Sequence, residues 1–353
     1  MTSPKNFLTI NFGCRVNAAE TNQWSQTFID QGFTPTKNKT PNVILINTCA
    51  VTKKGERESI NKVKQLRQIY PKAKIYVTGC ANPQKIKNLP NVKIFSNNQK
   101  EELLKSLKSF YHPKIKDKFT QSLRYLLKVQ SGCTHFCSYC IVPLRRNYLW
   151  SLSIQDAINT VKQAIKNGYQ EIIITGVNLN QYKPGFSNLL ESLLKETNIK
   201  LISFGSLPVN CIDDKFIKLL KKHPDRIQKF LHIPVQSGSD KILKLMNRPY
   251  GIKNIEDKFN QLKKIPHLSF GTDIIVGFPT ETEKDFKETL NLCKKIGFTK
   301  IHTFPFSPRP NTRARIIFEN SPKITKVILK SRSTQIRNLS AQSKLPSHQI
   351  LEN

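Results

Sequence analysis

Acidic residues are scarce in this chain of 353 residues. Aspartate and glutamate number 24 against 57 lysine and arginine residues, which gives a formal net charge of +33. A basic excess of this size favours a polyanionic partner, most often a nucleic acid, because neutralised phosphates release their counterions. The alternative is a merely lysine-rich composition, since lysine, asparagine and isoleucine are abundant along the whole chain.

Long apolar runs are also missing. No stretch of about 18 apolar residues exists, which argues against a transmembrane helix. No long apolar segment follows the first residues, so we expect no signal peptide, no membrane partner and a cytoplasmic protein. In that compartment the eight cysteines are expected to be metal ligands, reactive thiols or core residues rather than disulfides.

Short apolar runs alternate with helical patterns over residues 1–112. Strands are expected at residues 7–12, 43–48, 75–79 and 92–95, and helices at residues 18–31, 53–70 and 99–110. Such alternation predicts an α/β domain in which helices cover a parallel sheet. The polar segment 113–122, which includes Pro113, is expected to be a linker.

A second alternation covers residues 123–320. Strands are expected at residues 125–130, 171–175, 200–204, 230–235, 270–276 and 300–304. Ser153 and Thr282 are expected to begin helices that end at Gly168 and Gly297. Six strand–helix units predict a partial (β/α)6 barrel. Residues 321–353 are expected to form a basic helical tail.

Cys133, Cys137 and Cys140 follow the first expected barrel strand with three and two residues between them. Thiolates at this spacing can hold one small cluster. A cubane has four irons, so one iron would stay free for a substrate or cofactor. The alternatives are a structural zinc site, with His135 as a further ligand, or reduced thiols in a core.

Cys14, Cys49 and Cys80 are far apart in the sequence, but each follows the carboxyl end of an expected strand. In a parallel sheet these ends share one edge, and ligands bind there. The three thiols could therefore converge on a second metal site, or they could be packed in a core. Cys211 and Cys293 fit neither set and are expected to be core or surface thiols.

The segment around Cys133, Cys137 and Cys140, with the aromatic Tyr139 before Cys140, resembles the signature of radical S-adenosylmethionine (SAM) enzymes. Both sets together resemble the methylthiotransferases, a branch of that superfamily, over residues 7–315. The supporting segments are Gly-Cys-Arg-Val-Asn at 13–17, Asn-Thr-Cys-Ala-Val-Thr at 47–52, Leu-His-Ile-Pro-Val-Gln-Ser-Gly-Ser at 231–239, Thr-Asp-Ile-Ile-Val-Gly-Phe-Pro-Thr-Glu-Thr-Glu at 272–283 and Phe-Ser-Pro-Arg-Pro at 306–310.

This resemblance implies a radical SAM barrel behind an N-terminal methylthiotransferase domain, with SAM and two 4Fe-4S clusters as cofactors. It implies that the cluster on Cys133, Cys137 and Cys140 cleaves SAM, and that the cluster on Cys14, Cys49 and Cys80 holds the sulfur. An electron donor and a sulfur donor are implied as partners. The implied cofactor contacts are Tyr139, Gly176, Asn178, Gln236, Ser237 and Asp273, and the implied substrate contact is Arg146.

Each of these contacts has a plainer alternative. The loop at residues 175–178 could be an ordinary turn, and Arg146 a solvated surface arginine. Asp273 lies in an apolar strand, so it is either functional or paired with a basic core neighbour. His232 is expected to be a satisfied core histidine.

The residues after Cys14 and Cys49, with Arg57, Ser59 and the segment 98–100, resemble the branch that acts on N6-threonylcarbamoyladenosine beside the tRNA anticodon. That branch adds a methylthio group to C2 of the adenosine. The alternatives are isopentenyladenosine in tRNA, an aspartate of a ribosomal protein, another radical SAM reaction with the N-terminal cysteines merely buried, or a non-enzymatic RNA-binding protein stabilised by metal.

The chain departs from the family pattern in three places. Asn147 stands where a glycine is usual, and Pro208 where a glutamate is usual. The C-terminal RNA-binding β-barrel of the family is not recognisable. The basic residues 323–344 are therefore expected to contribute to RNA binding instead.

Overall fold

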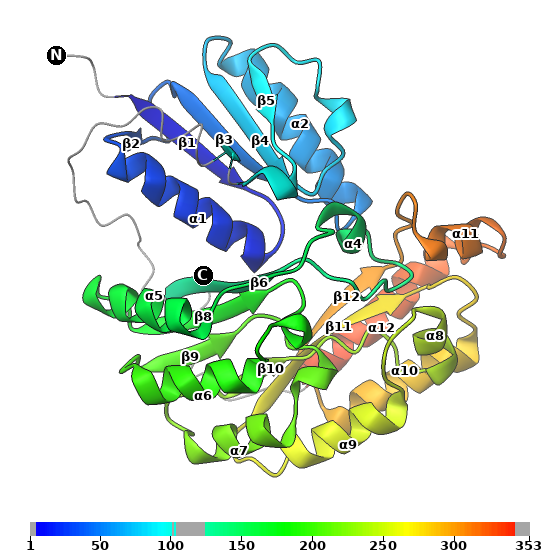
Figure 1. Cartoon of the computed structure of the whole chain (residues 1–353). Coiled ribbons are helices and arrows are strands. Elements are labelled where there is room, and N and C mark those ends of the chain that lie inside the picture. Colours follow the sequence, from blue (N-terminus) through cyan, green and yellow to red (C-terminus); the bar gives the residue numbers. More distant parts are fainter. Residues whose placement is uncertain (1–4, 101, 104–123, 343–353) are drawn as a thin grey trace. The chain divides into compact units, whose positions relative to one another are not determined.

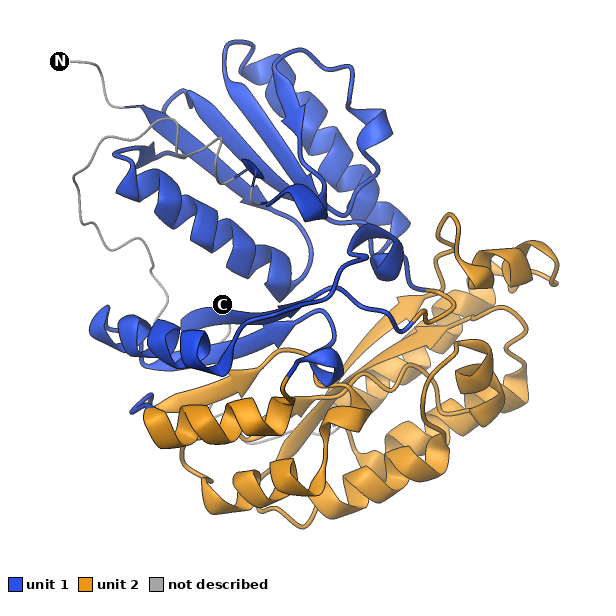
Figure 2. Cartoon of the chain, viewed as in Figure 1, with its two compact units in different colours: residues 1–135, 140–183, 197–199 blue, residues 136–139, 184–196, 200–353 orange. Residues whose placement is uncertain are grey.

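The structure, a computed structural model, describes residues 5–100, 102–103 and 124–342. The chain forms two compact units (Figure 2). Unit 1 comprises residues 1–135, 140–183 and 197–199, and unit 2 comprises residues 136–139, 184–196 and 200–353. Most of the expected helix at 99–110 and the whole linker at 113–122 lie outside the described residues, so the expected domain boundaries stay a prediction.

Unit 1 begins with a five-stranded parallel sheet in the order β2-β1-β3-β4-β5. The four expected strands are confirmed, and the short edge strand β2 is an addition. Figure 1 shows α1 and α2 on either side of this sheet. The elements are β1 Asn6–Asn11, α1 Arg15–Asp30, β2 Thr34–Pro35, β3 Val43–Thr48, α2 Lys53–Ile69, β4 Lys74–Gly79, β5 Val92–Ile94 and the 3-10 turns Pro83–Lys85 and Asn97–Gln99.

Both faces of this sheet are buried, which explains the uninterrupted apolar sequence of β3. Val43 and Leu45 pack with Trp24 and Phe28 of α1 on one face. The alternate residues of β3, with those of β4, pack on the other face against α2. The apolar sequence of β3 therefore places the sheet between two helices. Parallel pairing of β3 with β1 and β4 brings the carboxyl ends of the three strands to one edge.

The remainder of unit 1 contains the first barrel strands. Strand β6 pairs in parallel with β8 and antiparallel with the short β7. Helix α1 lies against β6 and β8 as well as against β1 and β3. The Ser153 side chain accepts a hydrogen bond from the Asp156 amide at 3.0 Å and begins α5 as expected. The elements are β6 Arg124–Ser131, α4 Val142–Arg145, β7 Trp150–Ser151, α5 Ile154–Lys166, β8 Glu171–Gly176 and the 3-10 turn Leu179–Gln181.

Unit 2 holds the other barrel strands and their helices. Strands β10, β11 and β12 are parallel neighbours, and a bridge between Ser206 and His232 joins the end of β9 to β10. The elements are α6 Phe186–Glu196, β9 Leu201–Phe204, the 3-10 turn Val209–Cys211, α7 Asp214–Lys222, β10 Phe230–His232, α8 Asp240–Leu245, α9 Ile252–Leu262, β11 Ser269–Val276, α10 Glu283–Ile296, β12 Lys300–Pro305, α11 Arg313–Glu319 and α12 Lys326–Gln342.

The expected α/β class and six barrel strands are confirmed, with one shortened strand. The expected strand at 230–235 ends at His232, because Pro234 has no amide hydrogen to continue a ladder. Helix α10 begins at the capping box of Thr282 and Asp285 and ends at Gly297, which has a φ of 74°. Cys211 and Cys293 are core thiols, and burial raises the pKa of Cys293 to about 12.

The expected C-terminal helix is confirmed as α12. Helix α12 packs against β12, β11 and α10 of unit 2, and Ile336 is fully buried. Its Arg332 is also buried, and Nη1 of Arg332 lies 2.6 Å from Oε2 of Glu281. Among the described residues, no helix is both long and apolar enough to cross a membrane.

Replacing Arg332 with methionine should lower the free energy of unfolding by roughly 3–5 kcal/mol, because it leaves the Glu281 carboxylate buried without its cation. Burial already raises the pKa of Glu281. Urea unfolding followed by circular dichroism measures the change. The control is Arg337→Met on the exposed face of the same helix, which should stay within about 0.5 kcal/mol of wild type. Equal losses in both variants would contradict the expectation.

Candidate metal centres

The three N-terminal cysteines lie at one edge of the first sheet. Cys49 and Cys80 directly follow β3 and β4, and Cys14 follows β1 after two residues and precedes α1. Because these strands are parallel neighbours, their carboxyl ends meet at this edge. We call it the cysteine edge. None of the three forms a disulfide; Cys14 is exposed, Cys49 half-buried and Cys80 buried.

Gly13 allows the close approach of two of these cysteines. Its φ is +95°, a conformation that residues with a side chain rarely adopt. A Cβ atom at this position would lie 2.8 Å from Sγ of Cys49. A glycine before Cys14 is therefore required both by the backbone and by the space that the Cys49 side chain occupies.

Polar side chains hold the loops of the cysteine edge. The side-chain amide of Asn17 donates to the backbone carbonyls of Phe12 and Thr48, both at 2.9 Å. These two residues lie just before the Cys14 and Cys49 loops. Oγ of Ser59 accepts a hydrogen bond from the Cys49 amide at 3.1 Å. These contacts fix the backbone on which the thiols sit, so the edge is ordered by groups other than a metal ion.

The cysteine edge fits a cluster better than a single ion. In a cluster each cysteine binds a different iron, so the sulfurs lie further apart than the ligands of one ion. Zinc bonds sulfur at about 2.3 Å, so its sulfur ligands are at most about 4.6 Å apart. The sulfurs of Cys14, Cys49 and Cys80 do not all lie within 4.8 Å of one another. A zinc ion would require these loops to move closer.

Cys133 lies in unit 1 after β6, with two of the residues that the sequence singled out. Its Sγ accepts hydrogen bonds from the Asn178 side chain and the His135 amide, both at 3.4 Å. The backbone amide of Asn178 donates to the side chain of Gln130 at 2.8 Å. A Cβ on Gly176 would lie 3.0 Å from Cβ of Gln130. Asn178 is thus beside Cys133 and Gly176 beside Gln130, and the cofactor role of both stays a prediction.

The turn before Cys133 also depends on a glycine. Gly132 has a φ of +83°, and a Cβ there would lie 1.6 Å from the carbonyl oxygen of Tyr148. The Cys133 amide donates to the carbonyl of Arg146 at 3.4 Å. Among the described residues, His135 joins no group of three metal-ligating side chains within 4.8 Å, so the zinc alternative gains no support from it.

Cys137 lies in the short segment of unit 2 that contains residues 136–139. Nη1 of Arg248 donates to its Sγ at 3.2 Å and to the Tyr139 hydroxyl at 3.4 Å. Burial disfavours the charged guanidinium, but Tyr139, Tyr250 and Cys137 outweigh it, so the pKa of Arg248 is raised. A permanent cation therefore donates a hydrogen bond to the Cys137 sulfur.

Two residues expected to bind the cofactor occupy a tight loop after β10. Gln236 has a φ of +75°, and backbone strain at a polar residue is common at functional sites. Ser237 exposes no surface, and its hydroxyl lies 3.3 Å from that of Thr289. Direct contact of Ser237 with a cofactor would need this loop to open.

Asp273 forms a cluster with two histidines on the adjacent strands. Its Oδ1 lies 3.0 Å from Nε2 of His232 and 3.3 Å from Nδ1 of His302. A Cβ on Gly271 would lie 2.8 Å from Nδ1 of His232, so glycine leaves room for that ring. Asp273 is therefore paired with basic neighbours, as the plainer alternative held, and His232 is a satisfied core histidine. A cofactor contact of Asp273 stays a prediction.

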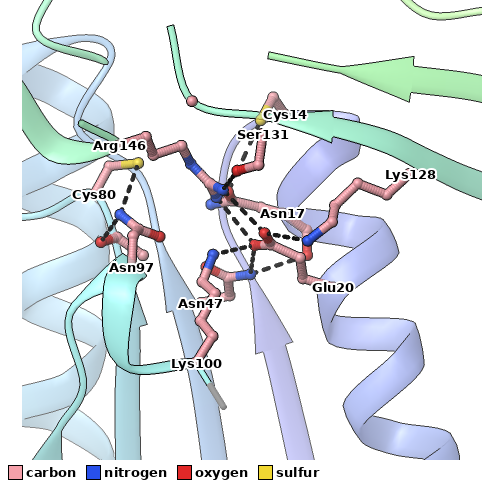
Figure 3. Close-up of polar contacts among 12 residues, drawn as sticks. Cys14, Asn17, Glu20, Asn47, Cys80, Asn97, Lys100, Lys128, Ser131 and Arg146 are labelled. Atoms are coloured by element: carbon pink, nitrogen blue, oxygen red, sulfur yellow. Dashed lines mark hydrogen bonds and ion pairs between the residues drawn. The ribbon is translucent and has the colours of Figure 1, made fainter. Parts of the chain in front are cut away.

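Arg146 is not a solvated surface arginine, because it is 1% exposed. Its guanidinium binds both carboxylate oxygens of Glu20, at 2.9 and 3.0 Å (Figure 3). Lys100 and Lys128 bind the same carboxylate at 2.6 and 3.1 Å. We call these four residues, with Asn17, Asn47 and Ser131 around them, the Glu20 network. Arg146 as a substrate contact stays a prediction, and no surface of it is open in this arrangement.

The Glu20 network contains more positive than negative charge. Burial opposes ionisation of Glu20, but Arg146 and the two lysines outweigh it and hold the pKa of Glu20 well below its usual range. Burial lowers the pKa of Lys100 to about 7, the repulsion from Arg146 adds to this shift, and Glu20 opposes it. One buried carboxylate thus faces three basic side chains.

Sequence reasoning did not find the partners of the cysteines. Glu20, Asn97 and Arg248 carry no motif, and each contacts groups far away in the chain. Asn97 donates to the carbonyls of Gly79 and Arg145, both at 2.9 Å. Asn147, which departs from the family pattern, accepts a hydrogen bond from Asn98 at 3.0 Å. An unpaired acid in the middle of an otherwise weakly polar helix was the one available signal for Glu20.

Comparison with known families follows this division of the cysteines. The model described as Radical SAM superfamily matches residues 127–293, which include Cys133, Cys137 and Cys140. The model described as Uncharacterized protein family UPF0004 matches residues 6–99, which include Cys14, Cys49 and Cys80. The fold and the cysteine motif thus define a radical SAM enzyme, and the superfamily implies SAM and a 4Fe-4S cluster.

Curated relatives cover most of the chain. The threonylcarbamoyladenosine tRNA methylthiotransferase MtaB of Aquifex aeolicus is 33% identical over 94% of this chain and 87% of its own length. The protein of the same name from Bacillus subtilis is 34% identical over 86% and 73%. The tRNA-2-methylthio-N(6)-dimethylallyladenosine synthase of Bdellovibrio bacteriovorus is 30% identical over 89% and 76%. The chain therefore belongs to the radical SAM methylthiotransferase family, as its motifs indicated.

Solved structures show the fold. The radical SAM methyltransferase TsrM of Kitasatospora setae superposes with a TM-score of 0.63 and 12% identity, over 89% of this chain and 77% of its own. The cobalamin-dependent radical enzyme OxsB superposes with a TM-score of 0.55 and 11% identity, over 95% and 56%. At such low identity the likeness concerns the fold alone.

Gly13→Ala should lower the iron bound at the cysteine edge, because the new Cβ displaces the Cys49 side chain. The matched control is Gly168→Ala. Gly168 also has a positive φ, +89°, but nothing lies within 4 Å of the new Cβ. Both variants should lose about 1 kcal/mol of stability. Iron per chain, measured after anaerobic reconstitution with Cys133, Cys137 and Cys140 changed to alanine, should fall only in Gly13→Ala. A similar fall in both would show backbone strain alone.

Lys100 should make stability depend on pH. Its pKa is about 7 in the folded chain and 10.5 in the unfolded chain, so the unfolded chain binds more protons between these values. The free energy of unfolding then rises with pH across that window, and the penalty is fully present below pH 7. Lys100→Met should reduce the slope by up to about 1.4 kcal/mol per pH unit. Urea unfolding at several pH values measures it, with exposed Lys72→Met as a control that should keep the wild-type slope.

Proposed function

We propose that this enzyme adds a methylthio group to C2 of N6-threonylcarbamoyladenosine beside the anticodon of tRNA. It uses two 4Fe-4S clusters, one on Cys133, Cys137 and Cys140 and one on the cysteine edge. The observation that carries the proposal is the convergence of Cys14, Cys49 and Cys80 on one sheet edge. Thiols from three separate loops that meet at the ligand-binding edge of a parallel sheet support the donor set of a cluster.

The residues around each cysteine set prepare it for this chemistry. When bound, the cluster on the radical SAM motif supplies the electron that cleaves SAM. Asn178 orients the Cys133 sulfur by a hydrogen bond, and Arg248 donates a hydrogen bond to the Cys137 sulfur. Asn17 and Ser59 fix the loops of the cysteine edge. Hydrogen bonds thereby order the loops of the cysteine edge before any iron binds.

Charge supports an RNA partner. The net charge is +33, and one groove of about 470 Å³ beside α2 is lined mainly by cations. Helix α2 begins four residues after Cys49, so a phosphate backbone along this groove would lead toward the cysteine edge. The basic residues of the groove are Lys53, Lys54, Arg57, Lys64 and Lys85.

The choice of nucleoside rests on the relatives and on a few residues. Relatives named for threonylcarbamoyladenosine are 32–34% identical, and those named for dimethylallyladenosine are 30–31% identical. Asn17, Ser59 and Lys100, which resemble the first branch, all support the cysteine edge or the Glu20 network. These three residues therefore indicate similarity to that branch, and the substrate contacts are made by other residues. Dimethylallyladenosine is the second candidate.

RNA binding by the C-terminal tail stays a prediction that deletion would test poorly. Helix α12 packs on unit 2 through Arg332 and Ile336, so removing it would expose core. The exposed basic residues of α12 are Lys326, Lys330 and Arg337. Changing these three to glutamine leaves the packed face intact and tests the tail by its charge.

The proposal is tested with reconstituted protein, SAM, sulfide, dithionite and anticodon stem-loops that carry either threonylcarbamoyladenosine or dimethylallyladenosine. Mass spectrometry of the nucleosides should show the methylthio product of the first, and Cys80→Ala should abolish it. About eight irons per chain support two cubanes, and about four leave only the SAM-cleaving one. Modification of dimethylallyladenosine alone would reassign the substrate, and zinc without iron would refute the proposal.

A further inference from the structure

Residues 145–146 are hydrogen-bonded to the loops that carry both sets of cysteines. The Arg146 carbonyl accepts from the Cys133 amide at 3.4 Å. The Arg145 carbonyl accepts from Asn97, which also donates to the Gly79 carbonyl just before Cys80. All of these residues belong to unit 1. The segment after the radical SAM motif thus reaches the cysteine edge directly.

The Arg146 side chain continues this connection. Its Nη2 donates to Oδ1 of Asn17 at 2.7 Å. The amide group of Asn17 holds the carbonyls of Phe12 and Thr48, which precede the Cys14 and Cys49 loops. Movement of the guanidinium would therefore reach both loops through a single asparagine.

Charge provides an independent argument. The Glu20 network buries Arg146, Lys100 and most of Lys128 around one carboxylate. A buried excess of positive charge is costly unless an anion compensates it. Figure 3 places the Arg146 side chain between the labelled Cys14 and Cys80, and the Cys14 sulfur lies 3.9 Å from the same Oδ1 of Asn17 that Arg146 binds. The missing negative charge would therefore come from the cysteine edge.

We propose that Arg146 is the positioning residue of the second cluster, whose negative charge it compensates and whose ligand loops it holds through Asn17. The inference rests on the two-cluster function proposed above. A cubane with three thiolates is an anion that gains a further negative charge on reduction. A fixed buried cation stabilises the reduced form more than the oxidised form, so Arg146 raises the reduction potential of this cluster.

The test isolates the second cluster in the full-length chain. Cys133, Cys137 and Cys140 are changed to alanine, iron and sulfide are reconstituted anaerobically, and the cluster is titrated with dithionite while its electron paramagnetic resonance signal is recorded. Arg146→Met should move the midpoint potential to a more negative value. The matched control is Lys128→Met, which removes another cation of Glu20 with side-chain exposure of 19%. It should move the potential less than Arg146→Met does.

Two further variants separate charge from folding. Arg146→Met leaves the Glu20 carboxylate buried with fewer partners, so the double variant Glu20→Gln with Arg146→Met restores a neutral pair. The double variant should fold and show a lower potential than Glu20→Gln alone, because both lack the carboxylate and differ only in the cation. Arg146→Lys keeps the positive charge but loses the paired N–H donors of the guanidinium. The cluster potential of this variant should therefore stay nearer to wild type than that of Arg146→Met.

The outcomes distinguish this inference from the function on which it rests. If the chain with an intact Arg146 binds no iron at Cys14, Cys49 and Cys80, the two-cluster function fails and this inference fails with it. If iron binds and Arg146→Met keeps the wild-type potential, or the double variant keeps the potential of Glu20→Gln, only the inference is overturned. An equal shift in Lys128→Met would also overturn it, because the effect would then be that of any cation around Glu20.

Discussion

The buried ion pair between Glu20 and Arg146 is the interaction on which the rest of unit 1 depends. It joins helix α1, beside the cysteine edge, to the segment that follows the radical SAM cysteines, across 126 positions of sequence. Both partners are about 1% exposed. Such a pair is stable only when every donor and acceptor is satisfied, and here Asn17, Ser131 and the two lysines complete it. Breaking one contact would therefore disturb several others.

This arrangement explains why a helix that packs on two sheets carries a charge in its middle. Helix α1 lies against β1 and β3 and also against β6 and β8. Its apolar residues build the core on one side, and Glu20 meets Arg146 and Lys128 on the other. A purely apolar contact would hold the elements together but would fix no orientation. The directional hydrogen bonds of a bidentate arginine do fix the relative orientation of these elements. Through Asn17 they also hold the loops of the cysteines.

An arginine lies beside each set of cysteines. Cys137 receives a hydrogen bond from the half-buried Arg248, and the buried Arg146 binds Asn17 at the cysteine edge. Arginine suits both places because its charge persists in a buried setting where lysine loses its proton, as the lowered pKa of Lys100 shows. A site that must gather several thiolates needs such fixed cations, since thiolates repel one another before the metal arrives.

The sequence by itself determined the α/β class, the order of the strands, the six candidate cysteine ligands and the family. These features depend on local patterns: apolar runs for β3, caps at Ser153 and Thr282, glycines at tight turns, and a short motif for Cys133 to Cys140. Its apolar pattern overestimates one strand, at 230–235, because Pro234 has no amide hydrogen to continue the ladder.

Only the tertiary structure decided how these cysteines are supported. The roles of Glu20, Asn97 and Arg248 arise from contacts between residues dozens of positions apart, and no local pattern encodes such pairings. It also decided that Arg146, expected near the substrate, is a buried partner of Glu20. Burial is what turns this arginine from one of 57 basic residues into a fixed charge, and burial is a property of the packed chain.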